Sequence, residues 1–209
     1  MRVAQSGLEA AAAAAAEALA GGGLIVMPTD TVCGLAASLE RPDAIAAIFR
    51  AKGRPAEMSL PVLVASIAEA QDLVPGELEA HEELLARHWP GALTVIVQAS
   101  PRIPPEVSAG RSTVGLREPA SEVARAILHA AGGALAVTSA NISGEPPAVG
   151  VVELSDKLLR NVALVIDAGQ CPGGVASTVL DLSTRPPRVL REGPIGVEQL
   201  RRLLPDLVT

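Results

Sequence analysis

The chain alternates between short apolar runs and longer segments with the periodicity of amphipathic helices. Most of these segments are bounded by glycine or proline, which commonly interrupt regular structure. The periodic segments predict helices over residues 7–20, 42–51, 120–131, 152–159 and 196–204, and two helices within 67–88 broken at Pro75-Gly76. The apolar runs predict strands over residues 24–27, 61–65, 93–98, 113–116, 135–138, 163–166 and 178–182.

Local sequence signals predict where two of these helices begin. Ser6 precedes the alanine-rich segment and is expected to cap the first helix, which the glycines at 21–23 then end. Pro42 is expected in the first turn of the second helix, where its missing N–H costs nothing.

The alternation of strand and helix predicts the fold class. It favours one α/β domain over residues 1–209, with a twisted, mixed or mainly parallel sheet and flanking helices. A chain of 209 residues suits one well-buried domain. The Pro- and Gly-rich loops at 100–112, 143–150 and 169–174 are too short to read as domain linkers.

Composition narrows the function classes. The chain has one Trp, one Phe and no Tyr, so its core must be aliphatic, and a platform that stacks single-stranded bases is disfavoured. A net charge of -6 argues against a generally electrostatic nucleic-acid binder. No signal peptide or membrane-length apolar stretch is visible. We therefore expect a cytoplasmic protein with no membrane partner.

The sequence assigns the cysteines and histidines no catalytic or metal-binding role. Cys33 and Cys171 are far apart and are expected to be free thiols, with Cys33 a small buried hydrophobe rather than a nucleophile. The three histidines lack metal-ligand spacing with the cysteines, so we expect no metal bound directly by the protein.

A basic cluster follows the second predicted helix. Arg50, Lys52 and Arg54 lie within five residues, a combination suited to a phosphate chain because lysine is a point charge and arginine a planar fork. The alternative is a set of solvated side chains that complement the helix dipole. Gly53 and Pro55 favour the site, because one permits close backbone approach and the other stiffens the chain.

Two further polar strings follow predicted strands. Residues 138–144 read Thr-Ser-Ala-Asn-Ile-Ser-Gly, more hydroxyl and amide groups than a turn requires. Residues 28–31 read Pro-Thr-Asp-Thr and could orient a small polar substrate, although taken alone a simple turn explains them better. Together with the basic cluster, these strings indicate a nucleotide site. Because no glycine-rich phosphate loop is present, the nucleotide would be bound by charged and hydroxyl groups.

Two segments near the end of the chain are less informative. Residues 175–181 and 188–193 each place polar residues beside a strand-like pattern, and alone they would indicate sheet edges.

The order of these segments resembles a known family. The motifs include Pro-Thr-Asp-Thr-Val-Cys-Gly-Leu at 28–35, Lys-Gly-Arg-Pro at 52–55, Trp-Pro-Gly-Ala-Leu-Thr at 89–94, Val-Gly-Leu-Arg-Glu-Pro at 114–119 and Ser-Ala-Asn-Ile-Ser-Gly at 139–144. Ser-Thr-Val at 177–179 and Leu-Arg at 190–191 complete the series. From about residue 22 to 193 the chain resembles the YrdC-like family of L-threonylcarbamoyladenylate synthases.

The resemblance implies a fold and a reaction. The fold is a YrdC-like domain whose sheet surrounds a large basic cavity. The reaction is nucleotidyl transfer: L-threonine, bicarbonate or CO2, and ATP give threonylcarbamoyl-AMP and pyrophosphate. Transferase proteins then carry the threonylcarbamoyl group to adenosine 37 of tRNA. Ending at Thr209, the chain resembles the short form without an extra C-terminal domain.

The resemblance also implies site residues. Lys52 and Arg54 are the expected catalytic residues, and the ATP-binding set is Lys52, Arg54, Thr113, Ser139, Asn141 and Arg191. The threonine-binding set is Thr29, Thr31, Arg117 and Ser177. Mg²⁺ is expected through the ATP phosphates. One departure is Leu63, which stands where many members have a histidine that contacts threonine. A segment at 56–60 could close over ATP.

Two alternatives stay open from the residues. One is a non-catalytic module that binds double-stranded RNA or tRNA, for which weak RNA binding by a basic cavity would suffice. The other is a carbamoyl-transfer domain that uses carbamoyl phosphate, although such domains usually sit in longer chains.

Overall fold

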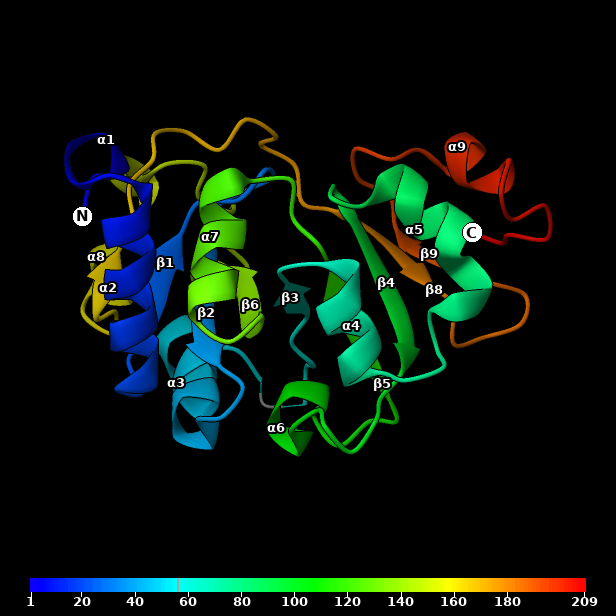
Figure 1. The fold of residues 1–209 in the computed structure, drawn as a ribbon, viewed down its shortest axis with the longest axis horizontal. Coiled ribbons are helices and arrows are strands. Elements are labelled where there is room, and N and C mark those ends of the chain that lie inside the picture. The colour runs from blue at the N-terminus through cyan, green and yellow to red at the C-terminus, as the bar shows by residue number, and fades with distance from the viewer. Residues whose placement is uncertain (56) are drawn as a thin grey trace.

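One mixed sheet runs along the whole length of the molecule (Figure 1). The computed structural model describes residues 1–55 and 57–209, so Ala56, where the expected ATP-closing segment begins, lies outside the described residues. Within the described part the strand order is β7-β1-β2-β6-β3-β5-β4-β8-β9. The strands are β1 Ile25–Met27, β2 Gly34–Ser38, β3 Val62–Val64, β4 Leu93–Gln98, β5 Thr113–Arg117, β6 Ala134–Ser139, β7 Leu164–Val165, β8 Thr178–Asp181 and β9 Arg188–Arg191.

The sheet is mixed rather than mainly parallel. Parallel pairing joins β1 to β7, β3 to β5 and β4 to β8, and the other described pairs are antiparallel. The expected sheet, mixed or mainly parallel, is therefore confirmed as mixed, although β2 is not among the predicted strands. This strand turns back directly after β1 and lies between β1 and β6, antiparallel to both.

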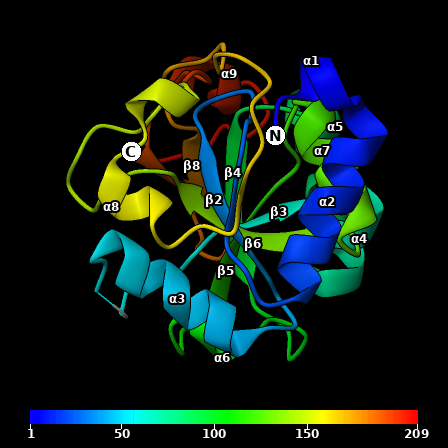
Figure 2. The same cartoon turned by 90° about the vertical axis from the view of Figure 1, so that its left-hand side faces the viewer.

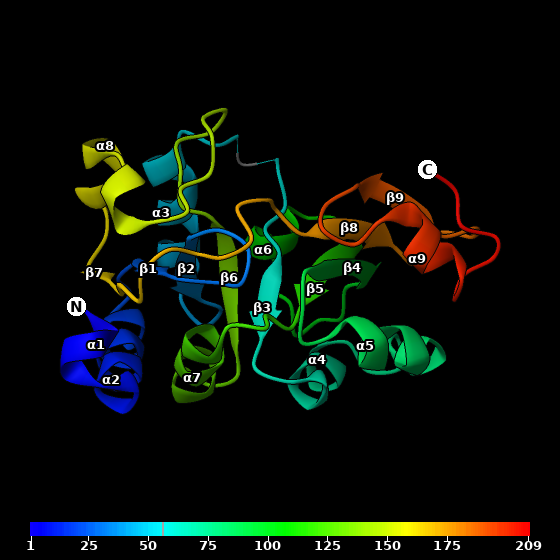
Figure 3. The same ribbon diagram turned by 90° about the horizontal axis from the view of Figure 1, so that it is seen from above.

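Helices cover both faces of the sheet, as expected for the α/β class. Figure 3 shows α2, α7, α4 and α5 along one face and α3 and α8 along the other, and Figure 2 shows the same two layers from the end. The α-helices are α1 Val3–Ser6, α2 Leu8–Ala20, α3 Pro42–Lys52, α4 Ile67–Leu73, α5 Glu82–His88, α6 Pro105–Ser108, α7 Glu122–Ala130, α8 Asp156–Leu159 and α9 Val197–Arg201. Short 3₁₀ turns lie at Glu79–His81 and Val151–Glu153. Among the described residues no helix has the length and apolarity to cross a membrane.

Small apolar residues build one of the two helical layers. Ala11 and Ala15 of α2 are fully buried and belong to the same cluster as Ile127 of α7 and Ile25 of β1. Alanine side chains let a helix approach its neighbours closely, and this compensates for the scarcity of aromatic rings. The core is aliphatic, as the composition indicates.

The helix starts agree with the sequence at one place and differ at another. Pro42 occupies the first turn of α3, as predicted. Ser6, in contrast, ends the short helix α1 and donates a hydrogen bond to the Arg2 carbonyl, while Gly7 precedes α2 with φ of 82°. The predicted Ser6 cap is therefore wrong, because glycine provides the left-handed link between α1 and α2 that serine would adopt only with strain.

The predicted helix over 152–159 is also divided. A 3₁₀ turn comes first, and α8 then begins after Ser155, whose hydroxyl accepts the amide of Leu158 at 3.3 Å. The predicted break in the 67–88 segment is confirmed, since α4 ends before Pro75 and α5 begins after a 3₁₀ turn.

Candidate functional site

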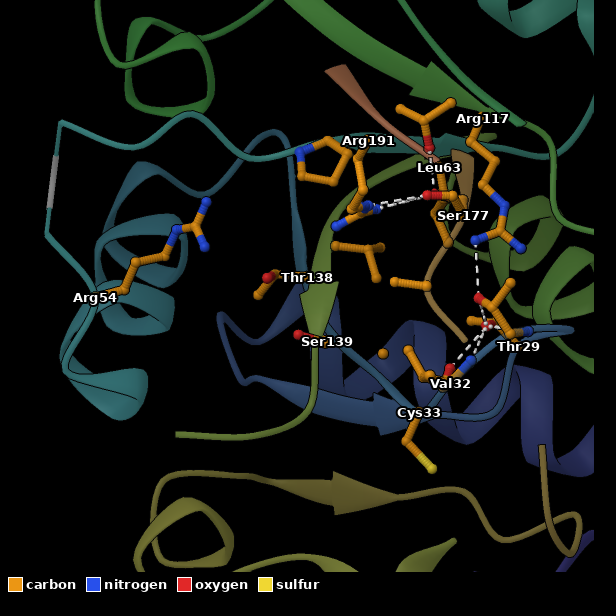
Figure 4. A pocket seen from close by; sticks show the side chains of 16 residues that line it. Thr29, Val32, Cys33, Arg54, Leu63, Arg117, Thr138, Ser139, Ser177 and Arg191 are labelled. Carbon is orange, nitrogen blue, oxygen red and sulfur yellow. Dashed lines mark hydrogen bonds between the residues drawn. The ribbon is translucent and has the colours of Figure 1, made fainter. Parts of the chain in front are cut away.

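A cavity of about 200 Å³ opens where several strands of the sheet end (Figure 4). Three arginines and several hydroxyl groups face it beside apolar side chains such as Leu63 and Val137, so the charged part of its lining is positive although the chain is negative overall. The contributing segments are the turn between β1 and β2, the segment after α3, strands β3 to β6, the residues just before β8 and the last residue of β9. The lining residues that bear on function are Thr29, Thr31, Cys33, Arg54, Leu63, Thr94, Arg117, Thr138, Ser139, Ser177 and Arg191.

Arg117 is fixed at the end of β5 by three partners from two segments. Its guanidinium donates to the Gly91 carbonyl at 2.8 Å, to the Thr31 hydroxyl at 2.9 Å and to the Asp30 carboxylate at 2.6 Å. The Arg117 and Asp30 side chains are 6% and 15% exposed, so the ion pair is largely shielded from water. Burial lowers the pKa of Arg117, and the Asp30 charge opposes that effect. One N–H on each terminal nitrogen remains for a ligand.

Two threonine hydroxyls extend this network. The Thr29 hydroxyl donates to the Val32 carbonyl at 2.7 Å and accepts the Thr31 amide at 3.1 Å. The two hydroxyls lie 3.0 Å apart, and because the Thr29 proton is already committed, Thr31 must donate to Thr29. The turn after β1 therefore both closes on itself and holds Arg117, which combines the turn and the site interpretations of residues 28–31.

Arg191 and Ser177 form a second group across the cavity. Two guanidinium nitrogens of Arg191 donate to the Ser177 carbonyl at 3.0 and 2.8 Å. The Ser177 hydroxyl lies 2.8 Å from the hydroxyl of Thr94 on β4. Burial, and then the charge of Arg117, lowers the pKa of Arg191. Two guanidinium groups in one cavity favour an anionic ligand between them.

Arg54 reaches the cavity from the segment after α3 (Figure 4). One terminal nitrogen donates to the Ser59 carbonyl at 2.9 Å, whereas its buried Nε has no hydrogen-bond partner among the described residues. An unsatisfied buried donor is costly, and an anion would satisfy it. Burial also lowers the pKa of Arg54, which a negative ligand would reverse.

Lys52 lies behind the cavity wall. It is 2% exposed, and its ammonium donates to the carbonyls of Ser139 and Asn141 and to the Asn141 side chain. The Ser139 hydroxyl in turn donates to Asn141 Oδ1 at 2.5 Å. Burial, and then the Arg54 charge, lowers the pKa of Lys52 to about 8. The cation therefore anchors the 139–141 turn, and Ser139 alone of these three residues lines the cavity.

The expected site residues are thus brought together to different degrees. Thr29, Thr31, Arg54, Arg117, Ser139, Ser177 and Arg191 all line the cavity. Asn141 and Lys52 lie directly behind it. Thr113 does not line it: the residue begins β5 and pairs with Gln98, at the opposite end of the strand from Arg117. Leu63, which departs from the family pattern, does face the cavity.

Two participants were not singled out from the sequence. Asp30 was seen only as part of its motif, and its pairing with Arg117 spans 87 residues, so no local pattern reveals it. Thr94 interrupts the apolar residues of β4 while being buried, and a hydroxyl at such a position was the available signal.

Fold and cavity together define an α/β protein with an arginine-lined cavity whose chemistry suits a small anionic ligand. The Sua5/YciO/YrdC family model, described as "Telomere recombination", matches residues 17–193, and the chain belongs to this family. A Mycobacterium tuberculosis relative is 40% identical over 187 residues, covering 90% of this chain and 86% of its own. The threonylcarbamoyl-AMP synthase of Bacillus subtilis is 37% identical, covering 87% of this chain and 53% of its own. Pyrococcus abyssi Sua5 complexed with L-threonine superposes with a TM-score of 0.90 at 34% identity, over 95% of this chain and 58% of that one.

Proposed function

We propose that this chain is an L-threonylcarbamoyladenylate synthase, an enzyme of the nucleotidyltransferase class. It condenses L-threonine, bicarbonate or CO2, and ATP into threonylcarbamoyl-AMP and pyrophosphate. The observation that carries the proposal is the cavity of three arginines and clustered hydroxyls in a chain of this family. Relatives from Bacillus subtilis and Pyrococcus abyssi bear the name of this activity. The product serves tRNA threonylcarbamoyl-transferase proteins in the cytoplasm.

The threonine side of the proposed site is built on Arg117. Its two remaining terminal N–H groups would bind the substrate carboxylate as a fork, the geometry in which arginine recognises carboxylates best. Thr29, Thr31 and Ser177 would orient the amine and the hydroxyl of threonine. Leu63 gives this wall an apolar patch instead of an imidazole.

The ATP side would extend beyond the cavity. A volume of about 200 Å³ lies below the roughly 300 Å³ at which sites for drug-sized ligands begin, so it suits an amino acid and part of a phosphate chain. Arg54 and Arg191 would bind phosphate oxygens. The 139–141 turn, held by Lys52, would receive the rest of the nucleotide through Ser139 and Asn141. Thr113 would contact the nucleotide only if the nucleotide extended to the end of β5 farthest from Arg117.

The proposed reaction forms no covalent bond between the substrates and the protein. The threonine amine adds to CO2 and loses a proton, which gives a carbamate. A carbamate oxygen then attacks the α-phosphorus of ATP, and the bond to pyrophosphate breaks. Arg54, Arg191 and the Lys52 charge behind them would stabilise the negative charge that gathers on the leaving group.

Mg²⁺ would accompany the nucleotide. No cluster of three or more His, Cys, Asp or Glu suited to a metal occurs among residues 1–55 and 57–209. The ion would therefore be held by ATP phosphates and water, which is its usual mode in nucleotide sites, and would supply charge neutralisation.

The proposal is tested by measuring pyrophosphate release from Mg²⁺-ATP while L-threonine or bicarbonate is omitted in turn. We expect release that requires both, with threonylcarbamoyl-AMP detected by mass spectrometry. ATP cleavage indifferent to threonine, or no cleavage by a protein that binds tRNA, would overturn it in favour of the RNA-binding alternative.

An arginine pair provides the matched variants for this assay. Arg54→Ala should lower kcat about a hundredfold, the usual cost of removing one electrostatic transition-state contact. Arg160→Ala, on an exposed surface outside the cavity, should leave turnover unchanged. Equal activity of both variants would remove Arg54 from the proposed machinery.

A further inference from the structure

The chain's two cysteines lie side by side next to the cavity. Cys33 follows the turn after β1 and Cys171 lies in the loop before β8, 138 residues later, yet their Sγ atoms are 3.7 Å apart. Both are buried, and Cys33 lines the cavity (Figure 4). The proposed reaction uses neither thiol.

One short segment holds both cysteines in this position. The Cys33 amide donates to the Ala148 carbonyl at 2.8 Å, and the Cys171 amide donates to the neighbouring Val149 carbonyl at 2.7 Å. In the loop that carries Cys171, Gly169 and Gly174 have positive φ and open space where a Cβ would lie, whereas Gly173 packs closely against the backbone of Asp30 and Thr31. The approach of the sulfur atoms therefore depends mainly on rotation of the two cysteine side chains.

We propose that Cys33 and Cys171 form a site of reversible thiol oxidation that closes as an intramolecular disulfide when hydrogen peroxide reaches the pair. The Sγ atoms must approach from 3.7 Å to about 2.0 Å, a shift within reach of side-chain rotation and loop adjustment. The site rests on this geometry and is independent of the proposed synthase activity.

The protonation of the pair favours Cys171 as the first thiol to react. A hydrogen bond from the Cys33 thiol lowers the pKa of Cys171 to about 7, and the same hydrogen bond raises the pKa of Cys33. The Cys171 thiolate attacks one oxygen of hydrogen peroxide, the O–O bond breaks, and the sulfenic acid and water result after proton uptake. Cys33 then attacks the Cys171 sulfur and loses its proton. The S–OH bond breaks, and a second water leaves.

The disulfide would join two walls of the cavity. The Gly174 amide already donates to the Thr31 carbonyl at 2.8 Å, so the loop before β8 rests on the turn after β1. Those two segments carry Thr31 and Ser177, which both line the cavity. Oxidation would therefore restrict their separation while leaving the rest of the sheet unchanged.

The test is the intact mass of reduced wild-type protein after treatment with hydrogen peroxide. We expect the loss of two hydrogens per chain, a non-reducing peptide map that links Cys33 to Cys171, and reversal by dithiothreitol. Met58, which is 44% exposed, reports by its sulfoxide that peroxide was active in the same sample. In urea the disulfide should form at least about tenfold more slowly, because unfolding separates the thiols.

Two variants assign the steps. Cys33→Ser should leave Cys171 to gain oxygen atoms without forming a disulfide, and Cys171→Ser should leave Cys33 largely unreacted. Oxygen adducts alone in the wild type, covalent dimers, or unreacted cysteines beside an oxidised Met58 would each overturn the proposal. The wild-type mass decides it even if a variant fails to fold.

Discussion

The contact between Asp30 and Arg117 is the residue-scale feature on which substrate positioning most depends. The Asp30 carboxylate accepts a hydrogen bond from the Arg117 guanidinium at 2.6 Å, in a position that is largely shielded from water. We predict that Asp30→Asn raises the KM for L-threonine about tenfold, since Arg117 loses the charge that orients it, a cost of about 1.4 kcal/mol. The KM for ATP should stay unchanged. Steady-state pyrophosphate release with each substrate varied in turn measures both.

An exposed ion pair supplies the control for this variant. Asp43 pairs with Arg41 at 3.1 Å on the surface, so Asp43→Asn should change neither KM. Equal rises in both KM values for Asp30→Asn would indicate a general loss of structure instead, and Asp30→Glu should recover part of the threonine affinity if the charge is what matters.

The lowered pKa of Lys52 makes the free energy of unfolding depend on pH. Its pKa is about 8 in the folded protein and 10.5 as a free side chain, so the unfolded state binds the extra proton between these values. The contribution of Lys52 to the free energy of unfolding must therefore rise with pH from about 8 to 10.5. We expect urea unfolding to show the wild type gaining stability over Lys52→Met between pH 7.5 and 10.

The other lysine of the chain is the matched control. Lys157 is exposed on α8, and Lys157→Met should track the wild type across the same pH range. A constant difference between wild type and Lys52→Met would contradict the depressed pKa.

Two serines near helix starts differ in whether they cap the helix that follows. The Ser121 hydroxyl accepts the Ala124 amide at 3.2 Å and caps α7, whereas Ser6 caps nothing. Ser121→Ala should lower the free energy of unfolding by about 1 kcal/mol, and Ser6→Ala should change it by no more than about 0.5 kcal/mol. Urea unfolding of both variants decides this, and equal losses would contradict the assignment of caps.

The elements that the sequence predicted well are those with local punctuation. α3 begins at Pro42, as predicted, and ends at Lys52, one residue beyond the predicted end, with Gly53 following at φ of 60°. β2 lacks such signals, because Gly-Leu-Ala-Ala-Ser has no β-branched or aromatic residue. Its extended state comes from pairing with β1 and β6 on either side, and no local pattern encodes that.

At the scale of the whole molecule, the site depends on strand order. β2, β6, β3 and β5 are neighbours in space but come from distant parts of the chain. The motifs named candidate residues, yet Arg117 and Thr113 lie on one strand and only the pairing of β5 shows which end meets the cavity. Lys52 likewise reads as a phosphate ligand in sequence, and its burial under the 139–141 turn is a tertiary property.

The continuous sheet also predicts how the molecule unfolds. Trp89, the single tryptophan, is 4% exposed and donates to the Leu93 carbonyl at 2.8 Å in one half of the sheet. If residues 1–209 form one domain, as the sequence indicates, Trp89 fluorescence and far-UV circular dichroism should follow the same urea transition. Separate midpoints would show that the halves unfold independently.

The two ends of the sheet bear on behaviour in concentrated solution. An open outer strand can recruit strands from other molecules and begin aggregation. Here β7 is short and continues into backbone pairing between Val3 and Asp167, while β9 pairs with Val208 and carries Arg188 and Arg191 at its ends. Covered edges and the exposed charge of Arg188 discourage strand pairing between molecules. The protein is therefore expected to stay dispersed in concentrated solution rather than associate through the ends of its sheet.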